Sequence, residues 1–297
     1  MASQVDFSSA IVVGTVRNAS NNVTSDLLRI VNALDQLLPT SAFVVESDST
    51  DATVRTLSEL AARDSRIKFV SLGIVADKIP DRIQRLRYCR NEYVREIREN
   101  PLYKSCDLVV VADLDGINTK IDFSKFQLAL NSSLKWDAFS ANQRGRYYDI
   151  LALRHPMWSP NNWATQAEWL TPFLGARAAR RHSMADRMIK IPSTLPPVAV
   201  ESAFGGLCIY RKWVFDKCDY SEDTPESADE IDHVTLNRKM RANGGNIFIH
   251  PGLINSNWTE HGLNGLPFIR NSKNLAQIFP FRLLLPILRR LARLAAK

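Results

Sequence analysis

Two carboxylates, Asp113 and Asp115, stand one residue apart, directly after an apolar run over residues 108–111 and directly before Gly116. The run predicts a buried strand of a parallel sheet, and ligands of open α/β sheets bind beyond the carboxyl ends of such strands. On extended backbone, residues two apart point to the same side, and hard oxygen ligands suit Mg²⁺ or Mn²⁺. We therefore predict a divalent cation at this pair, which would neutralise a diphosphate. A polar turn that merely follows a strand is the competing interpretation.

Other polar side chains extend this chemistry. Arg90 and Asn91 belong to a helix that we expect over residues 80–100, and an arginine offers a planar fork of donors to a diphosphate. The remaining arginines of that helix are mostly expected on a solvated face: Arg82, Arg85, Arg87 and Arg95. His250 or His261, after the last expected core strand, is a candidate third metal ligand, although a lone histidine is more often structural.

The middle of the chain carries side chains that suit a sugar. Residues 136–170 are rich in tryptophan, tyrosine, arginine and asparagine, which stack on and hydrogen-bond to sugars. Buried core aromatics are the competing explanation, and we favour it for Trp136 and Phe139. A glycine-opened strand over residues 203–211 would let a ligand or another backbone approach closely. A helix with acids at its start is expected from residue 230.

Simple alternation predicts the elements that position these residues. Expected strands at residues 10–13, 42–45 and 67–70 are separated by helical patterns, which predicts an α/β fold with a mostly parallel central sheet flanked by helices. Gly14 lacks the partners of a GxGxxG motif, and no GxxxxGK[ST] motif occurs. Dinucleotide-dependent oxidoreductases and P-loop enzymes are therefore disfavoured.

Composition limits the possible partners. The chain has 297 residues, and the seven basic residues after Glu260, where no acid occurs, account for its whole net charge of +7. A nucleic-acid-binding domain would spread basic charge over its folded body, so we predict no nucleic-acid partner. The four cysteines lack CxxC spacing and are expected as reduced, packed thiols. The first residues lack the features of a signal peptide, which predicts a cytoplasmic protein.

The tail after residue 260 has its own pattern. On a helical wheel two sets of its residues lie on opposite sides. The apolar set is Leu284, Ile287, Leu288, Leu291 and Leu294, and the basic set is Arg282, Arg289, Arg290, Arg293 and Lys297. We predict a C-terminal amphipathic helix on anionic lipid, which would hold the protein peripherally on the inner face of the cell membrane. A terminal helix packed on its own domain is the competing interpretation.

Several short motifs follow one another in a distinctive order. They are Glu46-Ser47 with Asp51-Ala52-Thr53, Arg82-Ile83 through Leu86 to Arg90-Asn91, Asp113-Leu114-Asp115, Tyr148-Asp149 with Leu153-Arg154, and Phe204-Gly205-Gly206. This order resembles the nucleotide-sugar glycosyltransferases of the GT-A fold. Apart from Asp113-Leu114-Asp115, where the sequence departs from the fungal pattern, the motifs resemble more closely the capsule-associated mannosyltransferase family first known from fungi. The resemblance covers residues 10–255. It implies a GT-A-like catalytic domain over residues 1–260, with a donor-binding half at about 10–118 and an acceptor-side half at about 119–260, followed by the tail, residues 261–297.

The resemblance also implies roles for single residues. Glu46 and Asp48 would lie near the nucleotide base or ribose, and Arg90 near the diphosphate. The full set of expected donor contacts is Val16, Arg17, Glu46, Asp48, Arg90, Asn91, Asp113 and Leu114. The expected metal ligands are Asp113 and Asp115, and His250 is added to them from its position after the last expected core strand. The expected acceptor contacts are Tyr148, Asp149, Arg154, Gly205 and Gly206.

Asp232 and His233 are the expected catalytic residues. In an inverting enzyme, a carboxylate at this place deprotonates the acceptor hydroxyl. The resembled family retains the anomeric configuration, and then both side chains would hold the acceptor or stabilise positive charge on the sugar ring. We favour an acceptor-side role in either case.

We therefore predict a metal-dependent glycosyltransferase, a hexosyltransferase. It would move a sugar, mannose by the family resemblance, from a GDP- or UDP-linked donor to a polysaccharide or lipid-linked saccharide acceptor. One alternative is a catalytically silent carbohydrate-binding or scaffold protein of the same fold, although the intact pair Asp113 and Asp115 argues against it. The other is a sugar nucleotidyltransferase, which would show a glycine-rich basic signature that residues 14–17 match poorly.

Overall fold

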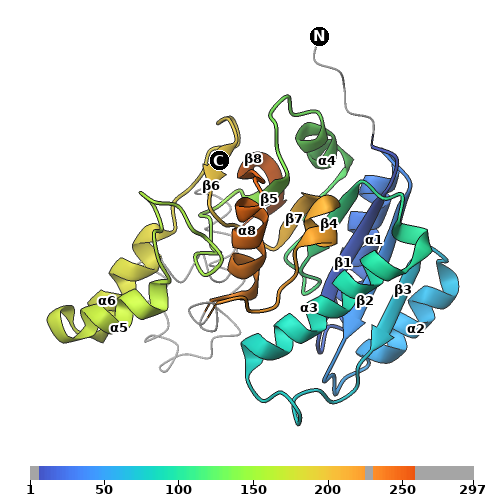
Figure 1. The fold of residues 1–297 in the computed structure, drawn as a ribbon, viewed down its shortest axis with the longest axis horizontal. Coiled ribbons are helices and arrows are strands. Elements are labelled where there is room, and N and C mark those ends of the chain that lie inside the picture. Colours follow the sequence, from blue (N-terminus) through green and yellow to red (C-terminus); the bar gives the residue numbers. More distant parts are fainter. Residues whose placement is uncertain (1–6, 225–229, 258–297) are drawn as a thin grey trace, which may run out of the picture.

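The computed structural model describes residues 7–224 and 230–257, which build one central sheet with helices on both faces (Figure 1). The eight strands have the order β3-β2-β1-β4-β7-β5-β8-β6. The strands are β1 (Ala10–Val16), β2 (Thr40–Glu46), β3 (Ile67–Ser71), β4 (Leu108–Ala112), β5 (Ala138–Gln143), β6 (Val198–Val200), β7 (Leu207–Arg211) and β8 (Ile247–Ser256). The helices are α1 (Val23–Asp35), α2 (Thr53–Arg63), α3 (Arg82–Glu99), α4 (Phe123–Leu130), α5 (Trp163–Leu174), α6 (Ala176–Ser183), α7 (Trp213–Lys217) and α8 (Asp232–Ala242), with short 3-10 turns η1 (Pro101–Tyr103) and η2 (Ala185–Arg187).

The first half of the chain forms the regular part of the sheet. β1 pairs in parallel with β2 and β4, and β2 pairs in parallel with β3, as the alternation predicts. Successive strand residues point to opposite faces. Ile11 and Val13 therefore pack in the core beneath α3, α7 and α8, whereas Val12 packs beneath α1, α2 and α4. Because both faces are covered, all five residues of β4 are buried up to the point where the carboxylates begin.

The second half breaks the regular order. β7 runs antiparallel between β4 and β5, and β6 runs antiparallel to β8, so six of the eight strands share one direction. The predicted α/β fold with a mostly parallel, helix-flanked sheet is confirmed. Trp136 and Phe139 are buried core residues, with ring centroids 4.6 Å apart. The four cysteines are buried free thiols, also as expected.

The basic tail lies outside the described residues, and with it His261 and the predicted amphipathic helix. Within residues 7–224 and 230–257, no helix combines the length and the apolar character that a bilayer-crossing segment needs. The expected division at about residue 118 falls in the loop between β4 and α4. The two halves therefore share one continuous sheet.

Candidate active site

A cavity of about 320 Å³ lies at the carboxyl ends of β1 and β4, the edge that the sequence predicts. This volume falls in the lower part of the range typical of small-molecule sites. The start of α8 and the loop after β5 complete its wall. Among the residues expected in the site, it brings together Val16, Arg17, Arg90, Asp113, Leu114, Asp115, Tyr148, Asp149, Asp232 and His233.

The backbone around Asp113 and Asp115 is held firmly, whereas their carboxylates are not. The Asp113 amide donates to the Gly206 carbonyl oxygen at 3.0 Å. Gly116 has a φ of +98°, which suits glycine, and its amide donates to the Asp26 carboxylate at 2.6 Å. In the described part of the chain, neither the Asp113 nor the Asp115 carboxylate accepts a hydrogen bond or forms an ion pair. Both are therefore available to a ligand.

The charge around Asp113 favours a cation. Burial raises the pKa of Asp113 to about 7; Arg90 opposes this rise, while Asp115, Asp149 and Asp232 add to it. A divalent cation would relieve this crowding of negative charge. The described residues contain no group of three or more His, Cys, Asp or Glu placed to hold a metal ion. The pair nevertheless fits Mg²⁺ or Mn²⁺, because Mg²⁺ is commonly bound by one or two carboxylates together with water and phosphate oxygens.

Arg90, Asp232 and His233 form a buried cluster in the same cavity. Arg90 Nε lies 2.9 Å from Asp232 Oδ2, and Arg90 Nη1 contacts the His233 ring. Asp232 Oδ1 accepts a hydrogen bond from the His233 amide at 2.9 Å. His233 stacks on Phe204 with 3.7 Å between ring centroids. Burial and the charge of Arg90 hold the pKa of His233 well below its usual range, so the imidazole is neutral at physiological pH.

The loop after β5 and the two glycines form one tightly packed wall. Asp149 Oδ2 accepts a hydrogen bond from the Gly205 amide at 2.9 Å. Gly205 and Gly206 have φ values of +67° and +84°. A Cβ atom would lie 2.5 Å from the Ala141 carbonyl oxygen at Gly205, and 2.9 Å from the Tyr148 hydroxyl at Gly206. The glycines thus allow close packing behind the cavity, and neither of them lines it.

Glu46 and Asp48, expected near the nucleotide, turn into the fold at the end of β2. Glu46 accepts a hydrogen bond from the Ser49 amide at 2.9 Å. Asp48, with a φ of +58°, accepts hydrogen bonds from the amides of residues 75 and 76, each at 2.8 Å. The Arg17 side chain donates to the Asp48 carbonyl oxygen at 3.2 Å. Both acids therefore build the loop that supports Arg17, and their part in nucleotide binding stays a prediction.

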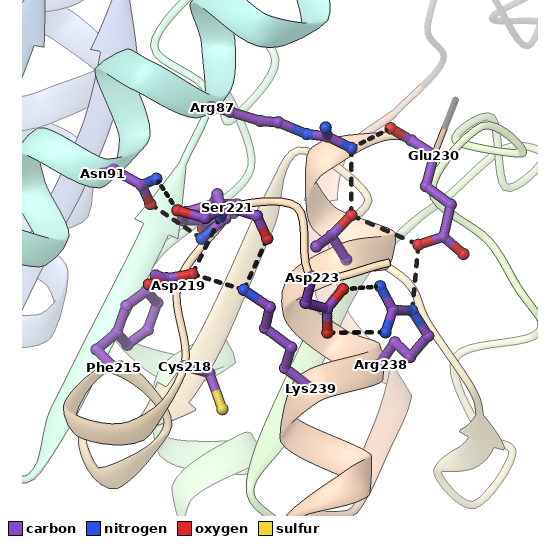
Figure 2. Close-up of polar contacts among 12 residues, drawn as sticks. Arg87, Asn91, Phe215, Cys218, Asp219, Ser221, Asp223, Glu230, Arg238 and Lys239 are labelled. Carbon is purple, nitrogen blue, oxygen red and sulfur yellow. Dashed lines mark hydrogen bonds and ion pairs between the residues drawn. The ribbon is translucent and has the colours of Figure 1, made fainter. Parts of the chain in front are cut away.

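Asn91, Arg154 and His250 do not line this cavity. Asn91 donates to the Ser221 hydroxyl at 2.9 Å and fastens that loop to α3 (Figure 2). Arg154 lines a second cavity of about 390 Å³. His250 packs edge-on against Phe139, with ring centroids 5.0 Å apart, and burial lowers its pKa. The histidine expected as a third metal ligand is thus a core residue of β8.

Arg87 corrects the expectation of a solvated arginine face on α3. Its side chain is 3% exposed and pairs with Glu222. It also donates to the Glu230 carbonyl oxygen at 2.8 Å (Figure 2). Residues three apart share a helix face, so the position of Arg87 beside Arg90 was a signal for its burial. These contacts tie α3 to the start of α8, which carries Asp232.

Among the lining residues that the sequence did not assign to the cavity are Arg82, Leu86 and Phe204. All three belong to motifs that carry the family resemblance. Arg82 is exposed, and among the described residues it has no hydrogen bond or ion pair. Phe204 supports His233 by stacking and also lies under the Arg90 guanidinium, 5.6 Å from the ring centroid.

The comparison with known proteins shows a similarity of fold only. No family model and no curated protein matches the chain. PcManGT, a mannosyltransferase from Pyrobaculum calidifontis solved with GDP-Man and Mn²⁺, is 12% identical with a TM-score of 0.49, over 86% of this chain and 58% of that one. Glucosyl-3-phosphoglycerate synthase from Mycobacterium tuberculosis with UDP is 13% identical with a TM-score of 0.40, over 85% and 70%. TarS 1–349 from S. aureus is 13% identical with a TM-score of 0.40, over 82% and 57%.

The chain thus spans less than two thirds of the length of PcManGT. At identities of 12–13%, what these proteins bind does not identify what this chain binds. Its activity has to be inferred from its own cavity.

Proposed function

We propose that this chain is a metal-dependent glycosyltransferase that moves a sugar from a nucleotide diphosphate donor to an acceptor hydroxyl. The observation that carries the proposal is the meeting of two unpaired carboxylates, Asp113 and Asp115, with guanidinium groups around one cavity at the carboxyl edge of the sheet. A cation and guanidinium groups together can compensate the charge of a diphosphate leaving group. The family resemblance favours mannose on GDP or UDP as the donor, and a polysaccharide or lipid-linked saccharide as the acceptor.

On the donor side, Asp113 and Asp115 would hold Mn²⁺ or Mg²⁺. The bound ion would supply charge compensation at the diphosphate. Arg90, expected there, is paired within the protein. Arg17 and Arg82 line the cavity and are exposed, so they are the guanidinium groups better placed to meet phosphate oxygens. Val16 and Leu114 supply apolar wall beside them.

On the acceptor side, Asp232 and His233 would meet the acceptor hydroxyl. A carboxylate can accept a proton, and a neutral imidazole beside it can orient a hydroxyl group. The second cavity offers room for the rest of a saccharide, because Arg154, Asn161 and Glu201 line it with hydrogen-bonding groups. Tyr148 and Asp149 line the first cavity and would contact the transferred sugar or the acceptor.

Asp232→Asn separates the possible roles of that carboxylate. If Asp232 is a general base, the variant lowers kcat by about 10²–10⁴-fold and leaves donor affinity unchanged. If it positions the acceptor, the acceptor KM rises instead. The anomeric configuration of the product, measured by NMR, distinguishes inversion from retention. Unchanged kcat and KM would remove Asp232 from the site.

Nucleotide binding with and without metal tests the proposal as a whole. GDP or UDP should raise the melting temperature only with Mn²⁺, because a ligand that binds the native state alone stabilises it by roughly 2.7 kcal/mol at a hundred times its Kd. Asp77→Asn, at an exposed carboxylate outside the cavity, is the matched control for substitutions of Asp113 and Asp115, and it should bind nucleotide as wild type does. Turnover that persists in excess EDTA would contradict the proposal. Metal-dependent nucleotide binding with neither donor hydrolysis nor transfer would favour a non-catalytic binding protein.

We also propose that the basic tail binds anionic lipid, with each basic residue near the surface contributing roughly 1 kcal/mol. Its sequence pattern is the only support. If a chain that ends at Phe279 co-sediments with anionic vesicles as fully as the intact chain, the tail has no such role.

A further inference from the structure

Helices α5 and α6 form a hairpin at the margin of the molecule, on the side away from β1–β3 (Figure 1). α5 contains no buried residue, although it is rich in large apolar side chains. Trp169 is 68% exposed, Phe173 71% and Leu174 50%. Trp169 and Phe173 are four residues apart, so they share one helix face, and their ring centroids are 5.3 Å apart. The two adjoining exposed rings form a contiguous apolar surface rather than scattered apolar residues, and contiguous apolar surfaces are typical of interaction sites.

The base of the hairpin is fixed to the body. Arg187, 7% exposed, donates to the Ser159 hydroxyl at 3.0 Å and to the Asn161 carbonyl oxygen at 2.9 Å. It also contacts the Gln166 side chain on α5. The Trp158 indole nitrogen donates to the Arg187 carbonyl oxygen at 2.6 Å. Hydrogen bonds at the base of the hairpin therefore hold the exposed rings of Trp169 and Phe173 in a fixed position relative to the body.

The second helix of the hairpin is basic. Arg177, Arg180 and Arg181 are all exposed. The exposed acids in this part of the chain are fewer: Asp186 pairs with Arg181 at 3.4 Å, and Glu168 lies on α5. The basic tail of this chain is thus a poor occupant for the surface, since like charges repel. An anionic partner is the complementary one.

We propose that α5 and α6 dock on an anionic lipid bilayer. Tryptophan and phenylalanine settle at the level of the lipid headgroups, and arginines beside them bind the headgroup phosphates. The position of the hairpin fits this role, because it directly follows the loop that places Tyr148 and Asp149 in the first cavity. Asn162 and Thr165, at the start of α5, line the second cavity. A bilayer under the hairpin would therefore lie beside the acceptor side of the site.

Vesicle binding tests the surface in the full chain. We compare wild type with Trp169→Glu/Phe173→Glu by co-sedimentation with vesicles of phosphatidylcholine and phosphatidylglycerol. The variant should need at least tenfold more lipid for half-maximal binding. Ile74→Glu/Leu102→Glu is the matched control, since both side chains are 69% exposed elsewhere on the protein, and it should bind as wild type. Arg177→Glu/Arg181→Glu should lose the preference for phosphatidylglycerol over pure phosphatidylcholine.

Two further measurements separate the hairpin from the tail and from self-association. The same comparison in the chain that ends at Phe279 removes the contribution of the tail, and the hairpin variant should still bind more weakly there. Equal binding of wild type and Trp169→Glu/Phe173→Glu in both chain lengths would refute docking through the hairpin. Sedimentation velocity without lipid gives a second check: self-association that the variant abolishes, with no vesicle binding, would make this surface a contact between two copies. Metal-dependent nucleotide binding in solution should be unchanged in the variant, so failure of the docking proposal is distinct from failure of the proposed activity.

Discussion

The first cavity contains two groups of charged side chains, and they differ in the partners that the protein itself provides for them. Asp113 and Asp115 have a fixed backbone and, among the described residues, no partner for either carboxylate. Arg90, Asp232 and His233 contact one another. The protein pairs no positive group with the carboxylates of the first group, so a ligand must supply the counter-charge. The second group is complete without a ligand, so its role is to hold a fixed arrangement against which an acceptor can be placed.

The largest expected effect breaks the first group. Asp113→Asn or Asp115→Asn should lower sugar transfer by at least about 10³-fold, because the metal that compensates the diphosphate is lost. Mn²⁺-dependent nucleotide binding, measured by calorimetry, should disappear with it. Circular dichroism should show that both variants remain folded, since neither carboxylate bonds to the protein. Transfer at the wild-type rate by either variant would remove that residue from the site.

The next effect breaks the second group. Arg90→Leu leaves the buried carboxylate of Asp232 without its counter-charge, which should cost about 3–5 kcal/mol of unfolding free energy. The double variant Arg90→Leu/Asp232→Leu removes both charges and should therefore be more stable than Arg90→Leu alone. Urea denaturation of the wild type, both single variants and the double variant measures this coupling. Additive losses would show that the pair is not coupled, and the contrast between the two groups would fail.

A smaller effect concerns the stability of the protein without metal, and it tests the unpaired charge of Asp113. Because burial and like charges raise the pKa of Asp113 to about 7, its ionised form costs stability above that pH in the absence of metal. Asp113→Asn should therefore raise the unfolding free energy by roughly 1–3 kcal/mol at pH 8 in EDTA. The folded carboxyl binds a proton that the unfolded one releases between about pH 4 and pH 7, so the gain should shrink as the pH falls through that range. Melting curves at pH 8, 6 and 4 would show it; a gain independent of pH would contradict this cause.

Local pattern was enough to predict the regular half of the fold. Strands β1, β2 and β4 contain continuous apolar runs because helices cover both faces, and such runs can be recognised without knowing their partners. The edge strand β3 is interrupted by the exposed Lys68. The reversal of β7 could not be predicted in this way. Its direction follows from pairing with β4 and β5, two strands distant in the sequence, and nothing within Leu207–Arg211 specifies it. The three-residue strand β6 is too short to give a periodic signal.

The same limit explains the candidate site. Asp113 and Asp115 could be found because acids after a buried strand are a local signal. The side chains of Glu46, Asp48 and Asn91 bond to segments far away in the chain, and motif order could not reveal these contacts. Their part in donor binding stays a prediction. Phe204 was assigned to a motif, but its stacking on α8 needed the tertiary structure.

His250 gives the smallest expected effect and tests how far the metal site extends. The sequence proposes it as a third ligand, yet it packs against Phe139 in the core. His250→Leu should therefore change the Mn²⁺ affinity, measured by calorimetry with GDP or UDP, by less than about twofold, since a lost ligand would cost far more. Stability should change by no more than about 1 kcal/mol, because His250 Nδ1 is buried without a hydrogen-bond partner and an apolar side chain suits that place. A tenfold or greater loss of Mn²⁺ affinity would return His250 to the metal site and show that the two carboxylates do not hold the ion alone.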